Sequence, residues 1–149
     1  MKGIIQVSLI SVVMLSLVVQ PVMGTDIEIH ENIYGFLAGH YIVIGKELDS
    51  EKTYYGKVVF SYEKGRFIVA RDIQGEILKG EGTIEHALGP DEVDVLRVRF
   101  AREGQEYEIT YLWQGDLDNY ARLSGVLYQP GELTDSPGLE ALFIDRSNN

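Results

Sequence analysis

Carboxylate and imidazole side chains alternate in the segment that follows an apolar N-terminal stretch. If this segment is extended, Asp26, Glu28 and His30 share one side of it, because side chains of an extended chain point alternately to opposite sides. Carboxylate and imidazole groups are ligands for divalent cations, so the spacing is compatible with a metal site. A frayed polar terminus gives the same pattern without a metal. We therefore expect neither a metal nor a cofactor here.

Two further candidates for metal chemistry lack the required spacing. His40 and His86 fall on expected strands, without the fixed ligand spacing of a catalytic zinc site. The run Gly-Asp-Leu-Asp-Asn at 115–119 resembles the start of a calcium-binding loop. That loop needs Gly at its sixth position and Glu at its twelfth, where this chain has Ala121 and Leu127. We expect a turn whose Asp and Asn side chains bond to the nearby backbone.

Catalytic chemistry has little support in the residues. The chain contains no Cys, which excludes a thiol nucleophile, a disulfide and Cys-ligated zinc. It has no Gly-x-Ser-x-Gly motif, and its Ser and Thr residues show no local pairing with His. Acid pairs such as Asp91 with Asp94, or Asp116 with Asp118, fall in expected surface turns, whereas a general acid needs a partly apolar cleft. An enzyme is therefore the least supported function.

Arg71 is the residue with the most chemical interest. It continues the alternation of Phe67 and Val69, which points its guanidinium to the apolar face of an expected strand. A buried guanidinium needs an anionic partner. That partner is Glu140, Asp72 or the carboxylate of a small ligand held over aromatic rings. Alternatively, the side chain extends from the strand end into water.

The elements that position these residues are mostly strands. Apolar and polar residues alternate in short runs between Gly-containing turns, and no helical period persists beyond about two turns. We expect an all-β fold: a single antiparallel meander that closes into a small barrel, with a short helical turn at 31–37 that could plug one end. The eight expected strands are 39–45, 54–62, 66–73, 77–86, 93–101, 105–113, 121–128 and 139–145.

Two hairpins can be predicted to the residue. With Glu103-Gly104 as a two-residue turn, apolar pairs share one face and polar pairs the other: Phe100 with Tyr107, Val98 with Ile109, Leu96 with Tyr111, Arg99 with Glu108 and Arg97 with Thr110. A Lys64-Gly65 turn pairs Tyr62 with Phe67, Phe60 with Val69 and Glu63 with Arg66. A three-residue loop at 63–65 would shift this second register.

Alternation defines the expected interior. Its side chains are Tyr41, Val43, Val58, Phe60, Tyr62, Phe67, Val69, Leu78, Ile84, Leu96, Val98, Phe100, Tyr107, Ile109, Tyr111, Trp113, Leu123, Leu127 and Phe143. Four glycines fall on the same face, which indicates close backbone approach in a closing sheet: Gly56, Gly80, Gly82 and Gly125.

The N-terminus indicates export. Residues 3–19 are apolar apart from one Gln and three Ser, follow Lys2 and precede Pro-Val-Met-Gly at 21–24, which is typical of a secretory signal peptide. A membrane anchor would need roughly 20 apolar residues, and this stretch ends in a helix breaker. We expect cleavage near Thr25, a single domain at 25–149 with its core at about 38–145, and a periplasmic or secreted location.

Charge excludes one class of partner. The full chain of 149 residues carries a formal net charge of −10, and loss of the segment with Lys2 leaves 12 basic against 23 acidic residues, or −11. Such a surface repels phosphate backbones, so we expect no nucleic acid. We also expect no stable membrane insertion after cleavage.

Short glycine motifs carry a family resemblance. They are Gly39-His40-Tyr41, Tyr55-Gly56-Lys57-Val58, Gly65-Arg66-Phe67-Ile68-Val69, Gly80-Glu81-Gly82, Leu123-Ser124-Gly125 and Gly138-Leu139-Glu140-Ala141-Leu142-Phe143. Their rhythm resembles small secreted bacterial β-barrels of the lipocalin-like or avidin-like kind, with Tyr41 where the first strand often has Trp. The resemblance implies a calycin-type barrel and does not bring an activity with it.

Two functions remain in view. The first is a secreted, non-catalytic barrel that binds a small apolar or amphipathic ligand in an aromatic-lined interior, which predicts a cavity. The expected ligand-binding residues are Arg71, Tyr41, Tyr62, Tyr107, Tyr111 and Trp113. The alternative is an extracellular or envelope-associated interaction module with a filled core, whose acidic surface or 129–138 loop contacts another protein. Nine Tyr against one Trp favour a polar pocket, because buried hydroxyls need partners.

Overall fold

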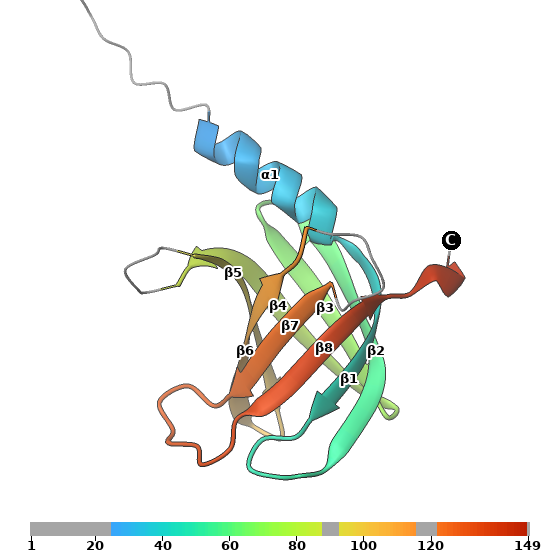
Figure 1. Ribbon diagram of the computed structural model, residues 1–149, viewed down its shortest axis with the longest axis vertical. Coiled ribbons are helices and arrows are strands. Elements are labelled where there is room, and N and C mark those ends of the chain that lie inside the picture. Colours follow the sequence, from blue (N-terminus) through green and yellow to red (C-terminus); the bar gives the residue numbers. More distant parts are fainter. Residues whose placement is uncertain (1–24, 88–92, 116–121, 149) are drawn as a thin grey trace, which may run out of the picture.

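Eight antiparallel strands form one closed barrel, with a helix at one end (Figure 1). The computed structural model describes residues 25–87, 93–115 and 122–148. Each strand pairs with the next, and β8 returns to pair with β1. The predicted fold class is confirmed, and each strand lies within two residues of its expected bounds. The elements are α1 (Thr25–Leu37), β1 (Gly39–Lys46), β2 (Thr53–Glu63), β3 (Arg66–Ile73), β4 (Glu76–His86), β5 (Asp94–Arg102), β6 (Gln105–Trp113), β7 (Leu123–Tyr128), β8 (Gly138–Ile144) and a 3₁₀ turn η1 (Arg146–Asn148).

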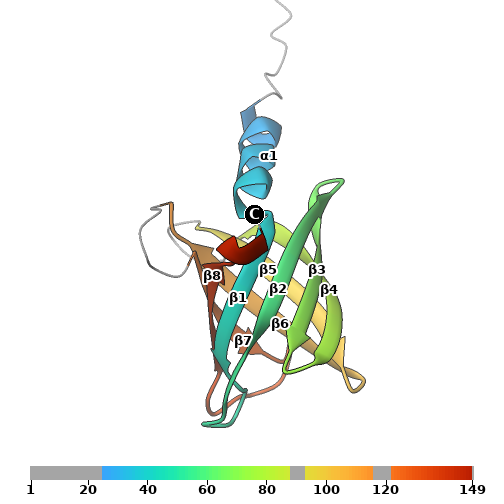
Figure 2. The same ribbon diagram turned by 90° about the vertical axis from the view of Figure 1, so that its right-hand side faces the viewer.

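The two ends of the barrel differ. The helix end holds α1 and the hairpin between β2 and β3, and the open end holds the connections β1–β2, β3–β4, β5–β6 and β7–β8 (Figures 1 and 2). Because the strands alternate in direction, every second connection lies at the same end. A side chain's position along its strand therefore decides whether it lies near the helix end or near the open end.

Both predicted hairpin registers are confirmed, with every predicted pair in place. The turn residues explain the fit. Lys64 and Gly65 have φ of 49° and 85°, and Glu103 and Gly104 have φ of 53° and 78°. Two successive positive φ values are those of a type I′ turn, whose twist matches that of the flanking strands. These two-residue turns fix the registers locally.

The helix end is closed by α1. Leu37 is fully buried, and the Tyr34 ring lies 4.8 Å from the Tyr62 ring and 4.9 Å from the Phe67 ring, centroid to centroid. The Tyr34 hydroxyl accepts the backbone N–H of Ile84 at 3.2 Å, and the Tyr41 hydroxyl donates to the Leu37 carbonyl at 2.9 Å. The expected plug is confirmed, but the helix begins at Thr25 instead of residue 31.

The helix corrects the prediction for the N-terminal acids. Asp26, Glu28 and His30 were placed on one side of an extended segment, but the backbone there is helical. The prediction that all three residues share one side rested on an extended backbone, so it does not apply to this helical segment. The predicted signal peptide at 1–24, the acidic turn at 116–119 and Asp91 lie outside the described residues.

Most of the predicted interior is confirmed, with two corrections. Phe143 was expected inside, but β8 turns Leu142 inward and leaves Phe143 on the outer face. Both faces of β8 carry large apolar residues, so alternation alone does not choose between them; pairing of Leu142 with the buried Val43 does. Tyr62 is 40% exposed, because it lies next to the last residue of β2, where its ring stacks on the outer side of the Tyr34 ring.

Two inward glycines make room for the interior. A Cβ at Gly56 would lie 2.1 Å from the Asp72 carbonyl oxygen. A Cβ at Gly125 would lie 2.4 Å from the Tyr111 ring. The close approach predicted for these glycines is confirmed. Because Gly125 has no Cβ, the Tyr111 ring can occupy the space beside it inside the barrel.

Candidate functional site

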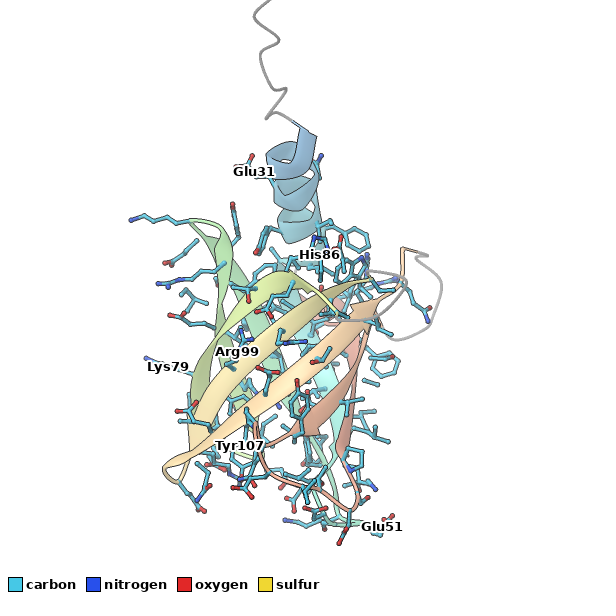
Figure 3. The ribbon with its side chains drawn as sticks, turned by 90° about the vertical axis from the view of Figure 1, so that its left-hand side faces the viewer. Glu31, Glu51, Lys79, His86, Arg99 and Tyr107 are labelled. Carbon is cyan, nitrogen blue, oxygen red and sulfur yellow. The ribbon has the colours of Figure 1, made fainter. Side chains whose placement is uncertain are left out.

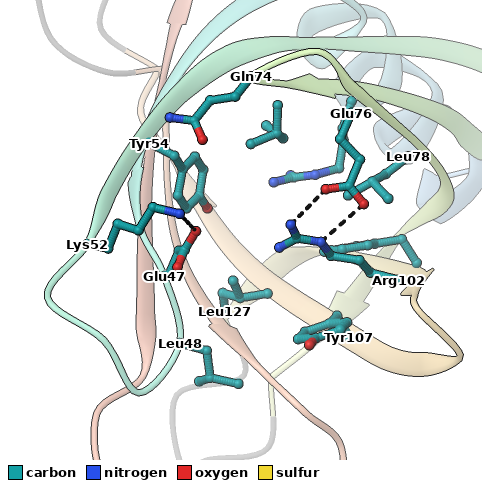
Figure 4. Close-up of a pocket in the computed structure, with 13 residues that line it drawn as sticks. Glu47, Leu48, Lys52, Tyr54, Gln74, Glu76, Leu78, Arg102, Tyr107 and Leu127 are labelled. Carbon is teal, nitrogen blue, oxygen red and sulfur yellow. Dashed lines mark hydrogen bonds and ion pairs between the residues drawn. The ribbon is translucent and has the colours of Figure 1, made fainter.

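A cavity of about 340 Å³ opens at the open end of the barrel (Figure 4). Its apolar wall consists of side chains from the β1–β2 loop and from four strands: Leu48, Ile73, Leu78, Phe100 and Leu127. Tyr54 and Tyr107 add aromatic surface, with the Tyr107 ring stacked on Phe100 at a centroid distance of 5.5 Å. The lining therefore combines this apolar wall with polar and charged side chains.

Two ion pairs stand at the rim of this cavity. Lys52 Nζ lies 3.1 Å from Glu47 Oε1, and Arg102 Nη2 lies 2.7 Å from Glu76 Oε2 (Figure 4). The hydrogen bond to Glu76 raises the pKa of Arg102. Because these side chains are partly in water, each pair contributes no more than about 1 kcal/mol to stability. The rim thus offers both signs of charge to a ligand.

A buried ion pair lies below the cavity. Arg71 and Glu140 have side-chain exposures of 2% and 0%, and the guanidinium contacts both carboxylate oxygens, with Nη1 at 3.1 Å from Oε2. The hydroxyls of Tyr54 and Tyr111 donate to the same carboxylate. Arg71 Nη1 also donates to the Tyr111 hydroxyl at 3.2 Å. We call these four residues the Arg71–Glu140 cluster.

In the Arg71–Glu140 cluster, each charged group stabilises the ionised form of the other. Burial by itself would raise the pKa of Glu140, but the charge and hydrogen bonds of Arg71 and the two hydroxyls lower it overall. Burial would lower the pKa of Arg71, but Glu140 raises it overall. Burial, with the nearby carboxylate, raises the pKa of Tyr54 and of Tyr111. At neutral pH the cluster is a charged pair held by two neutral hydroxyls.

This geometry decides between the alternatives for Arg71. Its partner is Glu140, 69 residues away in sequence, and the extension into water is wrong because the side chain is buried. Asp72 instead accepts the backbone N–H of Gly75 at 3.0 Å in an exposed turn. The Phe100 ring centroid lies 4.9 Å from Arg71 Cζ, and among the described residues Arg71 Nε has no hydrogen-bond partner.

The six predicted ligand-binding residues do not share one site. Arg71 and Tyr107 line the cavity, and Tyr111 lies below it in the Arg71–Glu140 cluster. The other three lie at the helix end: Tyr41, which is buried against Leu37, Tyr62 and the partly buried Trp113. Sequence reasoning missed Tyr54, although alternation from the inward Gly56 points it inward. Leu48 lies in a loop and carries no periodic signal.

A carboxylate joins two loops beside the cavity. Asp49 Oδ1 accepts the Thr134 hydroxyl at 2.8 Å and the backbone N–H groups of Asp135 and Ser136 at 3.1 and 2.9 Å. These bonds, above all the one from Ser136, lower the pKa of Asp49. Lys46 Nζ also donates to Ser136 Oγ at 2.8 Å. The β1–β2 loop is thus held to the β7–β8 loop at the open end.

The remaining predicted residues lie on the surface. His40 is exposed on β1, and His86 Nδ1 lies 2.6 Å from Asp94 Oδ1 at the helix end. Among residues 25–87, 93–115 and 122–148, no three His, Asp or Glu side chains are grouped to hold a metal ion. In the same part of the chain, no helix is both long and apolar enough to cross a bilayer. No protein-family model matches the chain, and no curated protein matches it.

Proposed function

We propose that this protein is a non-catalytic binding barrel that holds a small amphipathic ligand in the cavity at its open end. The observation that carries the proposal is a cavity of about 340 Å³ in a barrel whose helix end is filled by side chains. Ligand sites typically measure roughly 300–1,000 Å³ and are mostly apolar with a few fixed polar groups. This cavity meets the volume criterion at the small end of the range, and its apolar wall stands beside several polar and charged side chains.

The lining specifies the kind of ligand. An apolar portion would lie against Leu78, Phe100 and Leu127, where it is removed from water. A polar portion would face the rim, where Lys52 and Arg102 are partly exposed. A wholly apolar ligand would leave the rim groups without new partners, and a wholly polar one would gain nothing from the wall. An amphipathic ligand uses both.

The Arg71–Glu140 cluster serves as a rigid floor in this proposal. Arg71 donates to Glu140 and Tyr111, so its charge is already balanced. Tyr54 lines the cavity and its hydroxyl donates to Glu140, so the hydroxyl oxygen can act toward a ligand only as a hydrogen-bond acceptor. The floor therefore favours a neutral ligand donor over a ligand carboxylate.

The proposal extends to the location of the protein and to the family that it resembles. The apolar stretch at 3–19 with its flanks supports a signal peptide and a secreted or periplasmic protein. The closed eight-stranded meander and the glycine motifs support a calycin-type barrel of the lipocalin-like or avidin-like kind. The alternative of an interaction module with a wholly filled core is favoured less, since the cavity occupies the open end.

The test fills the cavity without changing the outer face. Leu78→Trp places a larger ring in the cavity, and Ile77→Trp places the same ring one residue away on the outer face, where Ile77 is 62% exposed. We expect Leu78→Trp to weaken binding of a fluorescent amphipathic probe such as anilinonaphthalene sulfonate at least tenfold, or about 1.4 kcal/mol. Ile77→Trp should leave it unchanged.

Circular dichroism of both variants controls for folding. Equal probe affinity in the two variants, or no saturable probe binding by the unaltered protein, would contradict the proposal. Native mass spectrometry of the protein from its own host, followed by denaturation, then identifies any ligand that co-purifies.

A further inference from the structure

The outer surface of the barrel has two contrasting sides. On β4, β5 and β6 the outward residues form a charged network, in which Arg99 contacts Glu85 and Glu108, each at 2.7 Å (Figure 3). On β7, β8 and β1, which face the viewer in Figure 1, the outward residues are mostly apolar. This second side has no role in the cavity at the open end.

Strand register joins these apolar residues into one surface. A single row of paired residues crosses five strands: Leu112, Ser124, Ala141, Ile44 and Tyr55. None of these five is Asp, Glu, Lys, Arg or His. A second row pairs Val126 with Leu139, and a third pairs Phe143 with Ile42. We call these nine residues the outer apolar face.

The outer apolar face is large for a surface that stays in water. Six of its large side chains are 41–70% exposed, with Tyr55 the most exposed. At roughly 200 Å² for a fully exposed large side chain, six that are about half exposed present roughly 600 Å². The largest apolar patch on a typical monomer measures about 300–600 Å² and is often functional. The outer apolar face lies at the upper end of that range, which makes it a candidate interaction surface.

We propose that the outer apolar face binds the same face of a second copy of this chain. A stable interface buries about 800 Å² per partner, of which roughly 450–520 Å² is apolar. The outer apolar face supplies that area by itself. The proposal is independent of ligand binding, because the two surfaces lie on opposite sides of the barrel wall.

The order of residues in the long row fits a two-fold contact between convex barrels. Small side chains, Ser124 and Ala141, lie in the middle, with Leu112 and Tyr55 at the two ends. Two curved surfaces approach most closely at the middle of the contact and diverge toward its edges. A two-fold axis near Ala141 therefore sets Ala141 against its own copy and Ser124 against Ile44, and it brings Tyr55 toward Leu112 of the other copy to fill the gap.

Charge disfavours the other occupants. The chain has a net charge of −10, which repels anionic bilayers. A basic partner would be drawn to the acidic parts of the surface instead of to a face whose long row has no charge. A second copy carries the same net charge, but the contact itself places no acids together, because the charged residues that pair with Leu139 and Ile42 at its edge are Lys46 and Lys57.

Sedimentation velocity of the purified protein from about 1 to about 100 µM tests the proposal. We expect a species of twice the chain mass. Ile44→Lys should weaken its formation at least about 30-fold, since it places an unpaired charge at the centre of the contact. Ile77→Lys makes the same substitution at an exposed Ile outside the face and should leave the dimer intact.

A second variant guards against misfolding. Tyr55→Ser removes a ring that is 70% exposed and adds no charge, so it should fold normally and still weaken the dimer. A monomer at every concentration, an intact dimer in both Ile44→Lys and Tyr55→Ser, or equal dissociation by Ile77→Lys would overturn the proposal. Binding of the monomer to zwitterionic phospholipid vesicles would overturn it in favour of a lipid surface.

Discussion

Removal of the charge on Glu140 is expected to destabilise the barrel strongly. Glu140→Gln keeps the shape of the side chain but leaves the Arg71 guanidinium, 2% exposed, without a counter-ion. Breaking a buried ion pair from one side costs about 3–5 kcal/mol, because the remaining charge has neither water nor a partner. Since domains of this size are stable by about 5–15 kcal/mol, this is a large share of the total.

The double variant separates the charge from the packing. In Arg71→Met/Glu140→Gln both charges are gone, and the amide can still hydrogen-bond the hydroxyls of Tyr54 and Tyr111. We expect it to be more stable than either single variant, with a coupling energy of about 3 kcal/mol. Urea unfolding followed by circular dichroism gives all four free energies. A cost below about 1 kcal/mol for Glu140→Gln, or additive single effects, would refute the argument.

The pH dependence of stability provides a second test of the role of Glu140. The pKa of Glu140 is lower in the folded than in the unfolded chain, so its contribution is complete above the unfolded value, 4.5, and is lost as pH falls through the folded value. The difference in unfolding free energy between the unaltered protein and Glu140→Gln should therefore narrow as pH falls from 7 toward 3. A constant difference across this range would argue against the ionised pair.

Two other predictions concern backbone fit and the loops of the open end. Gly56→Ala should lower the melting temperature and cost about 1–3 kcal/mol, because the new Cβ meets the Asp72 carbonyl oxygen at 2.1 Å. Gly35→Ala, whose Cβ would meet nothing within 4 Å in α1, should gain about 0.5–1 kcal/mol, and equal effects would contradict this account. Asp49→Ala should speed hydrogen exchange at the Ser136 amide. Acid should lower the protection factor of the same amide only below the ordinary Asp value of 3.8, because the pKa of Asp49 is lowered from that value; an unchanged protection factor would show that the loops do not depend on this carboxylate.

Local signals were sufficient where the interaction is local. The Lys64-Gly65 and Glu103-Gly104 turns predicted their hairpins to the residue, because a type I′ turn fixes the pairing of the strands it joins. Alternation then assigned side chains such as Phe60 to the interior. Gly56 and Gly125, which alternation places on the inner face, likewise predicted close backbone approach. These features depend on residues only a few positions apart.

Closure of the barrel decided what alternation left ambiguous. The face of β8 that points inward depends on its pairing with β1, about a hundred residues earlier, and this pairing put Leu142 inside and Phe143 outside. The same strand carries Glu140 to Arg71, which the sequence offered as one of several partners. A helical N-terminus replaced the expected extended segment because α1 packs Tyr34 and Leu37 into the helix end.

The sequence by itself determined the strands, two registers, most of the interior and the need of Arg71 for an anion. Only the tertiary structure decided that Glu140 satisfies that need. It also decided that Arg71 and Tyr107 line one cavity, whereas Tyr41 and Trp113 lie at the helix end. The outer row of residues without charged side chains, which crosses five strands, likewise depends on how the barrel closes. The physical reason is the range of each interaction. Turn geometry and side-chain alternation act between near neighbours, whereas the end of the barrel that a residue serves depends on how all eight strands close.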